Sequence, residues 1–235
     1  MKIKVGAATD TGLVRESNED AYLSEPPLYA VADGMGGHRG GEVASALALE
    51  TLGEGFKKEG AEGVAGTVQR ANEAIYERGS RDREVAGMGT TLTVAVTGED
   101  SLHLVHVGDS RAYLYRDGEL KPLTEDHTMV QEMVNEGSLT REAARNHPQR
   151  SVLTRALGIG DDIELDDLEV GVRPGDRILL CTDGLTATVP DARVAELLSD
   201  NKDPQAAAEK LVEAANDAGG VDNTTVVVLD VEEGV

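Results

Sequence analysis

The chain has 235 residues and a formal net charge of −22, from 44 acidic and 22 basic residues. A surface of this sign repels nucleic acid and anionic lipid, so the composition argues against both as partners. The charge suits simple solubility or, alternatively, adaptation to high salt. The single cysteine, Cys181, excludes an internal disulfide and lies in the apolar run 177–182, so we expect a buried structural thiol.

The length suits one domain over residues 1–235 with a large core. The N-terminus lacks an apolar run of signal-peptide length, and no stretch approaches the ~18 apolar residues of a membrane span. A cytoplasmic protein is therefore expected.

The first part of the chain combines strand patterns with two helical periods. The glycine-rich segment 34–41 suits a loop that approaches an ion or ligand closely. The expected elements are strands 3–9 and 28–32, then helices 42–58 and 63–78.

Strands dominate the middle of the chain, and helices return near its end. Residues 108–111 predict a hairpin or tight bend, and Asp117-Gly118 predicts a hairpin turn. This mixed order favours an α+β layered fold over a Rossmann-type sheet. The expected elements are strands 90–96, 102–107, 112–115, 120–123, 163–170, 177–182 and 224–231, and helices 126–136, 140–146, 190–198 and 203–218.

A polar segment at about residues 127–150 has little apolar surface to bury. Long polar segments inside compact domains are often functional lids. We therefore predict a flap over residues 127–150.

Three aspartates, Asp33, Asp183 and Asp222, follow or adjoin apolar runs and stand beside a Gly or Asn. Strand ends can deliver such carboxylates to one point, where they cannot all stay ionised without cations. Hard divalent ions, Mg²⁺ or Mn²⁺, prefer these oxygen ligands. Arg15 near such a centre suggests a phosphate substrate, because its guanidinium matches phosphate oxygens.

Five motifs in order resemble those of the metal-dependent protein phosphatases of type 2C, in their bacterial form. The resemblance covers essentially the whole chain and implies a four-layer α-β-β-α sandwich with two central antiparallel sheets. The motifs are Arg15-x-x-Asn18-x-Asp20, Ala32-Asp-Gly-Met-Gly-Gly37, Gly89-Thr-Thr91, Val107-Gly-Asp-Ser-Arg111, and Thr182-Asp-Gly184 with Asp222-Asn223.

The resemblance implies a centre with two metal ions. Asp33 would bridge the ions and Gly34 would offer its carbonyl, while Asp183 and Asp222 would ligate the first ion. Asp20 would lie near the second ion and contact it through a water molecule. Alternatively, Asp20 is only an acidic residue of a turn. A hydroxide bridging the ions would attack phosphorus directly, without a phosphoenzyme.

The resemblance also implies the surroundings of this centre. Arg15 would hold the substrate phosphate, and Glu19 and Asn223 would support the ligands. Asp109 resembles a ligand of a third, weaker ion shared with Asp183; alternatively, it only caps its bend.

The sequence offers two candidates for the proton donor. Animal and plant relatives carry a histidine where this chain has Met35. His38 is close in sequence and is our candidate donor, although a metal-bound water could serve instead. His147, in the flap, is a candidate for substrate contact. Arg39 replaces a residue that is commonly small in the bacterial relatives.

The resemblance implies a serine/threonine protein phosphatase that counteracts a bacterial serine/threonine kinase and acts on phosphorylated proteins, as a monomer. The acidic surface would favour basic sequence around the phosphosite. Alternatives are a phosphatase of a phosphorylated anti-sigma antagonist, a degenerate phosphatase that only binds, and a metal-binding structural protein. The intact metal motifs and Arg15 argue against these alternatives.

Overall fold

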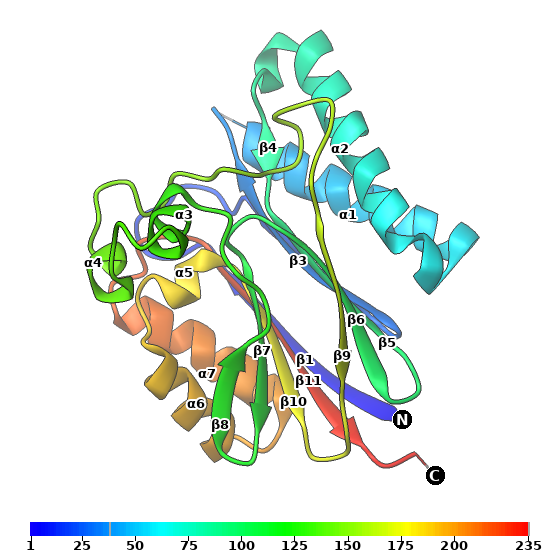
Figure 1. Cartoon of the computed structure of the whole chain (residues 1–235), viewed down its shortest axis with the longest axis vertical. Helices are drawn as coiled ribbons and strands as arrows, with labels where there is room; N and C mark the ends of the chain where they lie inside the picture. The colour runs from blue at the N-terminus through cyan, green and yellow to red at the C-terminus, as the bar shows by residue number, and fades with distance from the viewer. Residues whose placement is uncertain (38, 235) are drawn as a thin grey trace.

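In this computed structural model the described residues are 1–37 and 39–234, so the expected proton donor His38 lies outside them. Two antiparallel sheets form the centre of the molecule, which confirms the predicted α+β class (Figure 1). Within the described ranges, no helix combines the length and the apolarity needed to cross a membrane.

The first sheet has five strands, and the chain's two ends meet in it. β1 pairs with β11 along its whole length, from Lys2 opposite Glu232 to Asp10 opposite Thr224. Its spatial order is β1 (Lys2–Asp10), β11 (Thr224–Glu232), β10 (Arg177–Cys181), β7 (Arg111–Arg116) and β8 (Glu119–Pro122).

The second sheet has six strands. Its two-residue strand β4 (Gly89–Thr90) pairs with the end of β3. The other strands, in spatial order, are β2 (Asp20–Glu25), β3 (Leu28–Met35), β5 (Leu92–Thr97), β6 (Ser101–Val107) and β9 (Asp166–Gly171).

Helices cover both outer faces, which completes the α-β-β-α order (Figure 1). The six-stranded sheet carries α1 (Gly40–Glu59) and α2 (Val64–Arg81), and the five-stranded sheet carries α6 (Asp191–Asp200) and α7 (Pro204–Asp217). Shorter elements are α3 (Met129–Asn135), α4 (Arg141–Arg145), α5 (Asp183–Thr186) and the 3₁₀ turns Ala61–Gly63 and Arg83–Val85.

The central strands are apolar on both faces because each is buried on both sides. In β3, Leu28, Ala30 and Ala32 pack toward the helices, whereas Tyr29 and Val31 pack toward the other sheet. This explains why the run 28–32 does not alternate with polar residues. Cys181 is fully buried, as predicted, and burial raises the pKa of its thiol to about 12.

Two local predictions need correction, and two elements were missed. Of the two alternatives predicted for residues 108–111, the hairpin is wrong because β6 and β7 belong to different sheets. The chain bends at residues 108–109 as it crosses between them. The glycine loop is shorter than expected, since Gly34 continues β3 and Gly40 begins α1. A Cβ on Gly34 would lie 2.1 Å from the Gly41 carbonyl oxygen, so glycine allows this close approach. Neither β2 nor α5 was anticipated.

Candidate active site

One end of the sandwich collects the predicted carboxylates from both sheets. Asp20 and Asp33 lie opposite each other where β2 begins and β3 ends. Asp183 begins α5 directly after β10, and Asp222 precedes β11. Asp109 lies on the crossing from β6 to β7. Five residues from distant parts of the sequence thus meet at the same edge.

Threonine side chains hold Asp20 in place from the opposite sheet. The Thr182 hydroxyl donates to Asp20 Oδ2 at 2.7 Å and accepts from the Thr225 backbone N–H at 2.9 Å. Asp20 therefore has a defined orientation toward the gap between the sheets.

The strand end that carries Asp33 is fixed through a second pair of threonines. The Asp33 backbone N–H donates to Thr91 Oγ1 at 3.0 Å, and Thr90 Oγ1 donates to the Asp33 carbonyl at 2.9 Å. Thr91 Oγ1 also lies 2.7 Å from Ser110 Oγ, next to Asp109. The Gly89-Thr-Thr91 motif thus connects the Asp33 strand with the Asp109 crossing.

Asn223 fixes the loop that carries Arg15. Its Oδ1 accepts from the Glu19 backbone N–H at 2.8 Å, and its Nδ2 donates to the Thr11 and Ser17 carbonyls at 2.9 Å each. This amide therefore joins the start of β11 to the loop between β1 and β2.

Arg15 reaches the carboxylate cluster from that loop. Its Nη2 donates to Asp222 Oδ2 at 2.7 Å, while its side chain stays 49% exposed. The ion pair raises the pKa of Arg15, and the guanidinium stays charged. Its exposure leaves it accessible to an incoming anion.

The carboxylates disfavour their own ionisation. Burial, and then the charges of neighbouring aspartates, raise the pKa of Asp33 well above its usual value and also raise that of Asp183. Burial raises the pKa of Asp20 to about 7, against hydrogen bonds from Thr182 and Thr225. Burial and the charge of Asp183 raise that of Asp109 to about 8. Such a cluster demands protons or cations.

This donor set fits hard divalent ions, because it offers carboxylates without a Lys among them. Among residues 1–37 and 39–234, no three His, Cys, Asp or Glu side chains already stand as a complete ligand set. The charges of Asp20, Asp183 and Asp109 all act on Asp33. Bound cations would balance this accumulated negative charge.

The stabilisation of the folded protein by a bound metal is expected to increase with pH. Because the raised pKa values of Asp20 and Asp109 exceed those of the unfolded chain, the folded metal-free protein binds more protons. The contribution of these groups to stability therefore falls as pH rises from about 4 to about 8. Mn²⁺ favours the ionised forms, so it should raise the unfolding temperature more at pH 8 than at pH 5.

Thermal unfolding in Mn²⁺ and in EDTA, at both pH values, measures this difference. Titratable groups outside the cluster affect the unfolding temperature equally in Mn²⁺ and in EDTA, so their effect cancels in the difference. An Mn²⁺ gain that is the same at pH 5 and pH 8 would contradict the prediction.

Of the remaining predicted site residues, Glu19 directly precedes Asp20, and His147 lies in the flap segment. His147 is half-buried in the flap segment, where its Nδ1 accepts from the Gln149 N–H at 3.2 Å. No contact joins it to the described carboxylates. The Glu19 carbonyl accepts from the Gly34 N–H at 3.2 Å, and burial raises the pKa of the Glu19 carboxyl.

His127 is a structural link that the sequence did not reveal. Its ring Nδ1 accepts from the Gly108 backbone N–H at 3.1 Å, and the His127 backbone N–H donates to the Gly108 carbonyl at 2.8 Å. Its Nε2 lies 3.2 Å from Asp166 Oδ2. The start of the flap segment is thereby tied to the crossing that carries Asp109. Its place in a polar stretch gave no signal of this contact.

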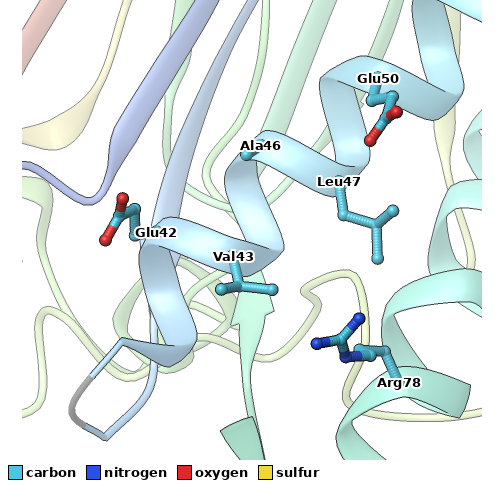
Figure 2. Close-up of a pocket in the computed structure, with 6 residues that line it drawn as sticks. All are labelled: Glu42, Val43, Ala46, Leu47, Glu50 and Arg78. Atoms are coloured by element: carbon cyan, nitrogen blue, oxygen red, sulfur yellow. The ribbon is translucent and has the colours of Figure 1, made fainter.

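A pocket between α1 and α2 lies outside this cluster. Figure 2 shows Arg78 of α2 facing Val43 and Leu47 of α1, with Glu42 and Glu50 on the helix. It encloses about 280 Å³, and none of the predicted site residues lines it. We therefore place the chemistry at the carboxylate cluster.

Known proteins share both the sequence and the fold. Residues 14–222 match the family Protein phosphatase 2C. The serine/threonine protein phosphatase PstP of Mycobacterium tuberculosis is 45% identical over 97% of this chain, which spans only 45% of that relative's length. The serine/threonine phosphatase stp of Listeria innocua is 37% identical, over 94% of this chain and 93% of the relative.

A solved structure adds a metal to the comparison. The crystal structure of the catalytic domain of PstP in complex with two manganese ions superposes with a TM-score of 0.90 at 41% identity, over 98% of this chain and 99% of that one. The family match covers most of the chain and includes the five aspartates gathered at the sandwich edge. The chain therefore belongs to the protein phosphatase 2C family.

Proposed function

We propose that the chain is a metal-dependent serine/threonine protein phosphatase that hydrolyses phosphoserine and phosphothreonine monoesters. The observation that carries the proposal is the convergence of five aspartates from both sheets beside the exposed Arg15. The similarity to bacterial serine/threonine phosphatases supports it.

The gathered oxygen atoms would hold the ions. Asp33 would bridge two ions, with the Gly34 carbonyl, Asp183 and Asp222 as further ligands and Asp20 nearby. The two manganese ions of the PstP catalytic domain support this number. When bound, divalent ions lower the pKa of water and stabilise charge on phosphoryl oxygens.

The chain's own residues would position the substrate. Arg15 would bind the phosphate through its guanidinium fork. The guanidinium would either leave Asp222 or keep that contact while it binds the phosphate. The threonine hydroxyls behind Asp20 and Asp33 would keep the carboxylates oriented. His38 remains the proposed proton donor, and His147 a proposed substrate contact.

Asp109, together with Asp183, would hold a third ion. Its place on the rigid crossing between the sheets, and the charge of Asp183 acting on it, support a shared role. We further propose that the protein acts as a monomer in the cytoplasm on phosphorylated proteins, opposite a serine/threonine kinase. The relatives are named as serine/threonine phosphatases, which supports a serine/threonine kinase as the opposing enzyme.

The proposed activity is tested by phosphate release from a phosphothreonine peptide. We expect turnover with Mn²⁺ or Mg²⁺ and at least ~100-fold less in EDTA, because the metals supply several kcal/mol of charge stabilisation. Activity that persists in EDTA would contradict a metal-dependent reaction. Folded protein that is inactive in every metal would contradict the phosphatase.

A further inference from the structure

A second pocket lies next to the carboxylate cluster and is defined here as the Met35 pocket. It is a half-open hollow of about 230 Å³ between the end of β3 and the segment that leaves the flap, with Met35, Leu153, Arg155 and Ile159 among its walls. Pockets for small molecules usually measure ~300–1,000 Å³, so this one suits a single side chain.

The pocket is continuous with the proposed reaction site. Asp33 and Met35 are two residues apart on one strand, so their side chains share a face and stand about 7 Å apart along it. In an extended peptide, side chains two residues apart are also separated by about 7 Å. A substrate whose phosphoresidue lies at Asp33 would therefore bring a neighbouring side chain to Met35.

The far wall is attached to the same framework. Thr90 and Leu157 exchange two backbone hydrogen bonds, of 3.1 and 2.9 Å, and Thr90 also pairs with Gly34 at the end of β3. Leu153 and Ile159, on either side of Leu157, are thus held at a fixed position relative to Asp33. The pocket is preformed, which lowers the entropic cost of filling it.

The lining favours an apolar occupant. Met35, Leu153, Ala156 and Ile159 are apolar, Ser151 and Thr154 add two hydroxyls, and Ile159 is 57% exposed. The charge of Arg155 is balanced by Asp166, whose Oδ1 lies 3.0 Å from Arg155 Nη1. Arg155 therefore has a carboxylate partner already, but its charge still opposes a lysine or arginine at this point.

We propose that the Met35 pocket binds an apolar side chain of the phosphoprotein substrate, within two residues of the phosphorylated Ser or Thr. The inference rests on the proposed phosphatase function and adds a determinant of substrate choice. It also limits the preference for basic sequence expected from the net charge, because a basic side chain is disfavoured at this position.

The test compares phosphothreonine peptides that carry Leu, Ala or Lys at each position within two residues of the phosphate. At one position, kcat/KM for Leu should exceed that for Ala by about tenfold or more, since filling an apolar pocket discriminates ~10–200-fold per methylene. Lys should be the poorest of the three. Ile159→Ser should reduce the Leu-to-Ala ratio to below about threefold, because the apolar wall is lost.

Val152→Ser is the matched control. Val152 is an exposed apolar residue of the same segment, 41% accessible, and does not line the pocket. This variant should keep the wild-type Leu-to-Ala ratio. p-Nitrophenyl phosphate, which has no flanking residues, reports the reaction without the pocket.

Each contrary outcome of the peptide experiment has its own interpretation. Equal kcat/KM for the Leu and Ala peptides at every position would overturn the inference and leave the phosphatase in place. Equal losses on p-nitrophenyl phosphate and both peptides in Ile159→Ser would show that the wall only supports the fold. A peptide preference that vanishes as enzyme concentration rises would assign the pocket to a second copy of the chain. Inactivity of the wild type on all substrates would overturn the proposed function itself.

Discussion

Asp33→Asn is expected to lower kcat/KM for a phosphothreonine peptide by at least ~10³-fold, which corresponds to about 4 kcal/mol. Asp33 lies opposite Asp20 in the sheet, and the charges of Asp20, Asp183 and Asp109 act on it. An amide cannot supply the negative charge that holds two cations together. Steady-state kinetics in saturating Mn²⁺ measure the loss.

Stability provides a second measure for the same variant. Removing one ionisable group from a crowded set relieves repulsion, so Asp33→Asn in EDTA at pH 8 should be at least as stable as the wild type. Mn²⁺ should raise its unfolding temperature less than that of the wild type. A variant that retains both full activity and the full Mn²⁺ gain would show that Asp33 holds no metal.

Two further variants calibrate this result. Asp161→Asn changes an exposed carboxylate outside the cluster and should leave both activity and the Mn²⁺ gain unchanged. Asp109→Asn should keep the Mn²⁺ gain in part but lose turnover, because only the proposed third ion is affected.

Arg177→Ala is expected to destabilise the fold by about 3–5 kcal/mol, because it leaves a buried charge and several carbonyls without their partner. Arg177 is 7% exposed. It forms a bidentate pair with Asp230, with distances of 2.5 and 2.8 Å. It also donates to the carbonyls of Leu198, Asn201 and Lys202 at the end of α6.

Chemical denaturation in EDTA at neutral pH measures this effect without the metal contribution. For a chain of this size the loss should lower the unfolding temperature by roughly 6–20 °C. Arg173→Ala is the control: its side chain is 58% exposed and pairs with the exposed Asp117, so its removal should cost less than about 1 kcal/mol. Equal effects of the two variants would contradict the importance assigned to Arg177.

Long, periodic elements were predictable from the sequence because their patterns reflect burial on one or two faces. Helix 42–58 is observed as α1 (Gly40–Glu59), and strand 224–231 as β11 (Thr224–Glu232). β2 escaped prediction because it is an edge strand of half-exposed, mixed residues without a clear alternation. Its position depends on pairing with β3 instead of on its own composition.

The candidate site was predictable only in part. Asp33, Asp183 and Asp222 were recognisable because each carboxylate adjoins a buried strand and a Gly or Asn. The supporting groups were not, since Thr182 meets Thr225 and Thr91 meets Ser110 only through contacts between segments 43 and 19 residues apart. Hydroxyls are common, and no local pattern tells which of them will face a carboxylate.

The sequence by itself determined the fold class, the family resemblance and the kinds of ligand atom, because these depend on periodicity and on residue type. Tertiary structure alone decided that residues 108–110 cross between sheets, that His127 ties the flap segment to that crossing, and that Met35 borders a pocket. Each of these depends on contacts between segments far apart in the chain. Such contacts follow from the packing of two sheets, which no short stretch of sequence encodes alone.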